Sequence, residues 1–228
     1  MWELTMGNLQ MVFFDMGGVL VRSMPLFSYI ANRIEGESHV DAELVRTSLV
    51  DHFNEKLKIV RNLLVEFKDV KDLFEESFSE TMRVLQIGGI PPRRASELYE
   101  KFFIDHVKLY PDTLPCLEAL RNLGIRLGII SDADWDVLEV EIERLGLMGF
   151  FDVIITSSMV KAYKPNPKIF LVALSKASCL AENSAYVGDS DVDVIGSKKI
   201  GMFSVLLDRG RRRYLEKSAR KQTSSPTI

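Results

Sequence analysis

The chain has 228 residues, 46% apolar and 27% charged, which are ordinary values for a globular protein with a sizeable core. Its net charge of −3 provides no global basic field that would favour nucleic acid. No apolar run approaches the roughly 20 residues that span a bilayer, and residues 1–10 lack the features of a signal peptide. The two cysteines form neither a metal cluster nor a disulfide framework, so we expect reduced thiols and a cytoplasmic location.

The first predicted element is a buried strand at residues 11–14, because this apolar run is too short and too aromatic for a helix. The strand ends at Asp15, and Gly17 and Gly18 follow closely. A glycine pair allows the backbone to approach a ligand. A carboxylate at the end of a buried strand costs free energy unless it is paired, so we expect Asp15 to have a cationic partner.

Residues 23–104 have a different pattern, in which amphipathic helices dominate and apolar strands are scarce. Asp41 and Asp69 are suited to helix N-caps, and glycines and prolines at residues 88–92 interrupt the helical pattern. A helical block between two strand regions is typical of an insertion. The predicted helices cover residues 26–34, 41–67, 69–85 and 92–103.

From residue 105 onwards, strands and helices alternate, which predicts a parallel sheet covered by helices on both faces. We therefore expect a Rossmann-like α/β core formed by residues 1–22 and 105–228, with the helical block inserted into it. The last segment, from residue 208, is rich in arginine and lysine. It fits either a nucleic-acid or membrane-surface patch or a solvated terminal segment, and we favour the second. The predicted strands of this part cover residues 126–130, 151–156, 184–187 and 203–207.

Polar residues stand at or just beyond the carboxyl ends of four predicted strands. They are Asp15, Ser131, Lys164 and Asp189. Open α/β sheets bind ligands outside these strand ends, so the four side chains should converge on one crevice. Clustered carboxylates repel unless a cation joins them, and oxygen ligands suit Mg²⁺. A lysine and a hydroxyl beside them favour an anionic substrate such as a phosphate.

In order along the chain, these segments resemble the four motifs of the haloacid dehalogenase-like (HAD) superfamily, whose members are mostly phosphatases. The segments cover residues 14–20, 129–132, 164–170 and 187–197. The position of the helical block resembles that of the family's helical cap, which covers the site and usually sets substrate choice. The resemblance implies Mg²⁺-dependent hydrolysis of a small phosphorylated metabolite through an aspartyl-phosphate.

The resemblance also implies roles for individual residues. Asp15 would be the nucleophile, and Lys164 would steady the nucleophile and the phosphate. Ser131, Asp132 and Gly18 would bind substrate. The metal ligands would be Asp15, the Gly17 carbonyl, Asp189 and Asp193, with Asp189 ranked above Asp193 and Asp193 above Asp191.

Position 17 departs from the family pattern. The phosphatases of the superfamily usually carry a second Asp two residues after the nucleophile, as general acid and base, and this chain has Gly17 there. Gly17 offers a backbone carbonyl to a metal but cannot carry a proton. General acid–base catalysis contributes about 10² to 10⁴ in rate, so leaving groups of low pKa should suffer least. Water or another residue, such as Asp134, could substitute.

Other interpretations of these residues remain open. Ser131, Asp132 or Asp134 could cap the helix that begins near Trp135, and Lys161 competes with Lys164 for the basic role. For the whole chain, one alternative is a metal-independent 2-haloacid dehalogenase, which the acidic cluster argues against. The other is a catalytically weak binding or regulatory protein, which Gly17 supports. The sequence predicts neither the substrate nor the oligomeric state.

Overall fold

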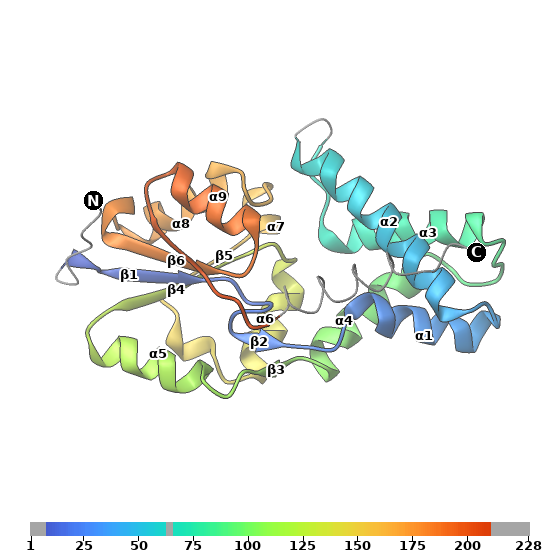
Figure 1. Cartoon of the computed structure of the whole chain (residues 1–228), viewed down its shortest axis with the longest axis horizontal. Coiled ribbons are helices and arrows are strands. Elements are labelled where there is room, and N and C mark those ends of the chain that lie inside the picture. Colours follow the sequence, from blue (N-terminus) through green and yellow to red (C-terminus); the bar gives the residue numbers. More distant parts are fainter. Residues whose placement is uncertain (1–7, 63–65, 211–228) are drawn as a thin grey trace, which may run out of the picture.

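The computed structural model describes residues 8–62 and 66–210, and its centre is a five-stranded parallel β-sheet (Figure 1). The strands run in the order β5-β4-β1-β6-β7. The first strand lies in the middle because Met11 pairs with Arg126 on one side and with Ser184 on the other. The α/β prediction is therefore confirmed. The strands are β1 (Met11–Phe14), β4 (Arg126–Ser131), β5 (Val153–Thr156), β6 (Ser184–Gly188) and β7 (Phe203–Leu206).

The two faces of the sheet bury alternate residues of β1, as the period of two in a strand requires. Met11 and Phe13 enter one apolar core, whereas Val12 and Phe14 enter the other. Figure 1 shows α8 and α9 on one face of the sheet and α5 on the opposite face. The helices of this part are α5 (Thr113–Asn122), α6 (Trp135–Arg144), α7 (Ser157–Val160), α8 (Pro167–Ala177) and α9 (Asp191–Lys199), with 3₁₀ turns η2 (Met148–Phe150) and η3 (Ala181–Asn183).

The helical block lies to one side of the sheet and is here called the cap, residues 23–104 (Figure 1). Two short antiparallel strands, β2 (Val21–Arg22) and β3 (Lys108–Leu109), pair where the chain leaves and rejoins the core. The exact division into cap and core stays a prediction. The cap helices are α1 (Leu26–Ser38), α2 (Ala42–Arg61), α3 (Val70–Val84) and α4 (Arg93–Asp105).

The N-termini of two cap helices differ in how they are capped. The Asp41 side chain accepts hydrogen bonds from the backbone N–H groups of Glu43 and Leu44, as predicted for α2. Asp69 stands at the N-cap position of α3, as predicted, but its side chain makes no capping hydrogen bond. Instead, Asp134 reaches from the core and accepts hydrogen bonds from Val70 N at 2.8 Å and Lys71 N at 2.9 Å. One core carboxylate therefore caps a helix of the cap.

Other contacts fasten the segment before α3 to the core. The Tyr163 hydroxyl donates to Lys68 O at 2.9 Å, and the rings of Phe67 and Tyr163 stack with centroids 5.0 Å apart. Lys161 Nζ lies 3.2 Å from Asp69 Oδ1. These contacts explain why residues 66–69 are not helical, although the sequence predicted a helix as far as residue 67.

Some sequence predictions concern the ends and the surface of the chain. Most of the basic C-terminal segment lies outside the described residues, so neither interpretation of it is tested. Both cysteines are free thiols. Within residues 8–62 and 66–210, no helix has the length and apolar character needed to cross a bilayer.

Candidate active site

The centre of the site is Asp15, directly after β1. Its backbone N–H donates to Val187 O at 2.9 Å, which holds the residue in line with β6. Its Oδ1 accepts a hydrogen bond from Met16 N at 2.8 Å, and its Oδ2 lies 3.0 Å from Lys164 Nζ. Burial raises the pKa of Asp15 to about 6; the Lys164 charge opposes this shift, and the acids Asp193 and Asp189 add to it. The expected cationic partner is therefore present.

The loop after Asp15 turns sharply back on itself. The backbone N–H groups of residues 19–21 all point to Met16 O, and Gly18 N donates to Val21 O at 2.9 Å. Gly18 has φ of 76°, a conformation that favours glycine. Its N–H is used in this turn and Gly18 does not line the pocket, so these contacts assign it a part in shaping the loop, while its role in substrate binding stays a prediction. Gly17 does line the pocket, and a Cβ at Gly17 would meet no atom within 4 Å.

Lys164 is the buried cation of the site, with 2% of its surface exposed. Its Nζ lies 3.0 Å from Asp15 Oδ2 and 2.7 Å from Asp193 Oδ1. Burial alone would lower the pKa of Lys164, but the charges of Asp15 and Asp193 raise it well above its usual range. Lys164 is therefore a permanent charge, whereas the competing Lys161 lies on the surface beside Asp69.

Asp193 is fully buried in α9, and both of its oxygens already have partners. Besides Lys164, its Oδ1 lies 3.1 Å from the Tyr186 hydroxyl, and its Oδ2 accepts from Ser190 N at 3.0 Å and Asp189 N at 3.2 Å. Burial opposes ionisation, but the Lys164 charge and the Ser190 hydrogen bonds lower the pKa of Asp193. These contacts hold the lysine and the loop after β6 in place.

Three carboxylates gather at the strand ends, as the sequence predicted. One oxygen each from Asp15, Asp189 and Asp193 lies within 4.8 Å of the others, an arrangement that could hold a metal ion. Gly188 is required for this close packing, because a Cβ there would lie 2.4 Å from both Cβ and Cγ of Asp193. Like charges this close are stabilised by a cation, and Lys164 supplies only one positive charge.

Ser131 and Asp132 follow one another at the carboxyl end of β4, and both line the pocket. Neither caps α6, since Trp135 N donates to Ser158 Oγ at 2.9 Å. The Asp132 carboxylate accepts from Lys164 N at 2.9 Å and from Arg61 Nη2 at 3.0 Å. Burial raises the pKa of Asp132, and the charges of Lys164 and Arg61 oppose this shift. Asp132 thus connects the lysine loop to the cap.

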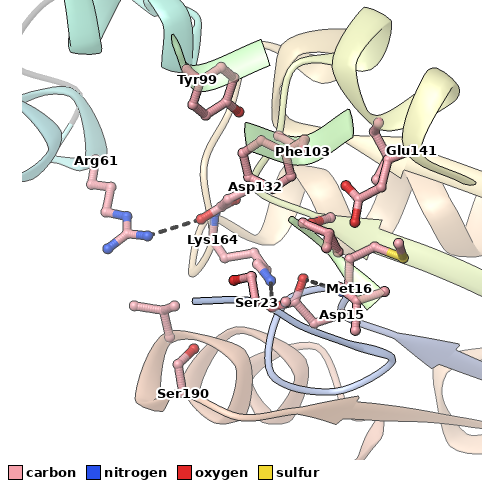
Figure 2. A pocket seen from close by; sticks show the side chains of 17 residues that line it. Asp15, Met16, Ser23, Arg61, Tyr99, Phe103, Asp132, Glu141, Lys164 and Ser190 are labelled. Carbon is pink, nitrogen blue, oxygen red and sulfur yellow. Dashed lines mark hydrogen bonds and ion pairs between the residues drawn. The ribbon is translucent and has the colours of Figure 1, made fainter. Parts of the chain in front are cut away.

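A pocket of about 230 Å³ opens over Asp15 between the core and the cap. Figure 2 shows the Lys164 side chain reaching Asp15 and the Arg61 guanidinium reaching Asp132 from the cap side. Tyr99 and Phe103 of α4 form another part of the wall. Because cap and core side chains both line the pocket, a substrate bound to Asp15 would contact both.

Among the site residues that sequence reasoning missed are Arg61, Glu141 and Tyr186. Nothing in the pattern of α2 singles out Arg61. Tyr186 lies in an apolar strand, and only its hydroxyl group could have indicated a role in the site. Glu141 was readable, because it shares the buried face of its helix with Leu138 and Ile142, where an acid is unusual.

Comparison with known proteins decides the family. The sequence matches the haloacid dehalogenase-like hydrolases over residues 12–207, which is most of the chain. The chain belongs to this family. The predicted resemblance is thus confirmed, and this haloacid dehalogenase-like hydrolase is an enzyme.

Named relatives of this hydrolase include two phosphatases. A glyceraldehyde 3-phosphate phosphatase of Methanocaldococcus jannaschii is 29% identical over 213 residues, covering 90% of this chain and 87% of the relative. The protein of the same name from Methanopyrus kandleri is 35% identical over 116 residues, and the match spans about half of both chains, 49% and 48%. The structure of the L-2-haloacid dehalogenase from Xanthobacter autotrophicus aligns with a TM-score of 0.74 at 20% identity, covering 96% of this chain and 85% of that one. This last similarity shows a shared fold.

Proposed function

We propose that the protein hydrolyses small phosphomonoesters with Mg²⁺, through an aspartyl-phosphate formed on Asp15. The observation that carries this proposal is the pairing of Asp15 Oδ2 with the buried Lys164 Nζ at 3.0 Å, beside a group of carboxylates at the edge of the pocket. One cation that steadies both a carboxylate nucleophile and an incoming phosphate suits phosphoryl transfer.

Three polar side chains of the pocket, those of Asp15, Lys164 and Ser131, then have roles in the chemistry. Asp15 attacks phosphorus, and the bond between phosphorus and the leaving oxygen breaks. Lys164 and the Ser131 hydroxyl hold the phosphoryl oxygens. Water then attacks the phosphorus of the aspartyl-phosphate, releasing phosphate and restoring the Asp15 carboxylate.

The acidic group fits Mg²⁺, which prefers oxygen ligands and keeps some positions for water and phosphate. Asp15, Asp189 and the Gly17 carbonyl would hold it. Asp193 was also predicted as a ligand, but its contacts with Lys164 and the loop after β6 favour a positioning role. When bound, Mg²⁺ supplies positive charge that offsets the repulsion between the carboxylates and the phosphate.

A small phosphorylated metabolite is the substrate class that the pocket favours. Its volume of about 230 Å³ suits a compact ligand, and the names of the relatives indicate glyceraldehyde 3-phosphate for those proteins. The proposal includes no nucleic-acid or membrane partner. It places the enzyme in the cytoplasm, in keeping with two free thiols.

The test is the turnover of p-nitrophenyl phosphate in the presence of Mg²⁺. Asp15→Asn removes the charged nucleophile, so we expect activity to fall to background. Asp136→Asn, an exposed acid of α6, is the control and should retain activity. Removal of the metal with a chelator should also abolish turnover. Equal rates for Asp15→Asn and the wild type would refute the aspartyl-phosphate mechanism.

The alternative of a 2-haloacid dehalogenase is less favoured, because the carboxylates beside Asp15 make chemical sense chiefly with a cation. Release of chloride from 2-chloropropionate in the presence of a chelator would establish it. A catalytically weak binding protein would show tight ligand binding by calorimetry and no turnover on a broad panel of phosphorylated metabolites.

A further inference from the structure

The proposed reaction needs a proton donor that position 17 does not supply. Several other groups of the pocket are unsuited to the task. Lys164 is a permanent cation held between two carboxylates. Burial raises the pKa of Tyr99 well above its usual range, which makes it a poor acid near neutral pH. The Asp132 carboxylate already accepts two hydrogen bonds.

Glu141 stands apart from these groups. It lines the same pocket as Asp15 and Gly17, and only 2% of the residue is exposed. Within the described part of the chain, no hydrogen-bond partner reaches its buried Oε1. Figure 2 shows its carboxyl group pointing from α6 into the pocket, toward the side formed by Met16 and Asp15. A buried carboxyl group without a partner is costly when charged, so such a group is kept where it has a function.

The surroundings of Glu141 favour its protonated form. Burial raises the pKa of Glu141 to about 8; the Arg144 charge opposes this shift, and the Asp15 charge adds to it. Arg144 lies on the same helix but donates its Nη2 to the carbonyls of Val107 and Phe103. Tyr99 faces Glu141 from α4 as a neutral phenol. Glu141 is therefore a carboxylic acid with an available proton near neutral pH.

We propose that Glu141 is the general acid and base of this hydrolase, in place of the side chain that Gly17 lacks. This inference rests on the proposed function. As Asp15 attacks phosphorus and the P–O bond to the leaving group breaks, the leaving oxygen takes the Glu141 proton and departs as an alcohol. The Glu141 carboxylate then takes a proton from the water that attacks the aspartyl-phosphate. Phosphate leaves, and both Asp15 and Glu141 return to their starting forms.

The kinetic test compares leaving groups that differ in their need for a proton. The probes are 2,4-dinitrophenyl, p-nitrophenyl and phenyl phosphate, in order of decreasing acidity of the leaving phenol, and kcat/KM reports the step that forms the aspartyl-phosphate. For Glu141→Gln we expect a loss of about 10² or more on phenyl phosphate and less than about 10-fold on 2,4-dinitrophenyl phosphate. Glu139→Gln, an exposed acid of the same helix, is the matched control and should behave as the wild type.

A rescue variant separates catalysis from folding. A side chain at position 17 has free space, since a Cβ there meets no atom within 4 Å. We therefore expect Gly17→Asp to restore at least about 10-fold of the phenyl phosphate activity lost in Glu141→Gln, as an acid at either position can donate the proton. Near pH 7, acids with a pKa of about 6 are mostly ionised, so the infrared band of a protonated carboxyl group should be present in the wild type and weaker in Glu141→Gln, which gives a readout independent of turnover.

The outcomes distinguish this inference from the proposed function. If Asp15→Asn abolishes turnover while Glu141→Gln loses nothing on phenyl phosphate, the function stands and the inference fails. An equal loss on all three probes would assign Glu141 to binding or folding and would also overturn the inference. If the wild type turns over none of the probes, the proposed function and the inference fail together.

Discussion

At the scale of single residues, the site depends on one buried lysine that two carboxylates share. Lys164 Nζ lies within 3.0 Å of both Asp15 and Asp193, so the two acids share this cation. Breaking a buried ion pair leaves an uncompensated charge, which costs more than losing a surface pair. The position of Asp193 therefore affects the ion pair between Lys164 and Asp15.

A substitution at Gly188 tests whether the site depends on the position of Asp193. In Gly188→Ala the new Cβ would meet Asp193 atoms at 2.4 Å, so we expect Asp193 to be displaced and the free energy of unfolding to fall by about 1–3 kcal/mol. Gly17→Ala is the matched control, since its Cβ has open space, and its stability should change by less than about 1 kcal/mol. Urea denaturation measures both variants, and equal stabilities would contradict the close packing of Gly188 against Asp193.

At the scale of elements, the N-terminus of α3 is capped by a residue that lies in a different part of the fold. The two N–H groups that donate hydrogen bonds to the Asp134 carboxylate belong to the cap. Asp134 itself lies in the core, directly before α6. Helix N-termini require such acceptors because their first N–H groups have no partner within the helix. This helix end therefore depends on contact between cap and core.

Asp134→Ala should consequently loosen the cap. We expect a loss of about 1–2 kcal/mol in the free energy of unfolding, together with faster hydrogen exchange at the amides of Val70 and Lys71. Asp41→Ala is the matched control, because Asp41 caps α2 within the cap itself. Its effect on exchange should be confined to the start of α2. Unchanged exchange at Val70 and Lys71 in Asp134→Ala would contradict the capping role.

At the scale of the whole molecule, burial of acids makes stability depend on pH. Burial raises the pKa of Asp134 from 3.8 to about 6 and that of Glu141 from 4.5 to about 8. An acid whose pKa is higher in the folded state stabilises the fold while it is protonated, and this contribution is lost as the pH rises through the folded-state value. For these two acids, the stabilisation is lost as the pH rises from about 4 to about 8.

The free energy of unfolding should therefore fall between about pH 5 and about pH 9, by an amount on the order of a few kcal/mol for Glu141. Glu141→Gln should show a smaller fall, because glutamine cannot ionise. Urea denaturation at the two pH values measures the difference. In the control variant Glu139→Gln, where the replaced side chain is exposed, the free energy of unfolding should fall by as much as in the wild type. A fall of the same size in Glu141→Gln would contradict the raised pKa.

Much of this architecture was predictable, for reasons that differ between core and site. The strand run before Asp15 and the glycines after it are local signals. Three of the four motifs lie at strand ends, so the parallel sheet followed from periodicity and position, whereas Lys164 lies beyond β5, after the short helix α7. The absence of helix at residues 66–69 was not predictable, because Phe67 and Lys68 contact Tyr163, which lies far along the chain. Glu141 could have been noticed as an acid on the apolar face of its helix, but its place in the pocket depends on tertiary contacts that the sequence does not show.

The central position of β1 has a consequence for the order in which the protein can be assembled during synthesis. Its partners begin at Arg126 and Ser184, long after the strand itself has left the ribosome. Until then this apolar segment has no neighbour in the sheet, while the cap helices can already form contacts close in sequence. Pairings between distant residues form slowly, and unpaired apolar strands promote aggregation. The strand that leads to Asp15 is therefore the strand of the sheet that waits longest for its neighbours during synthesis.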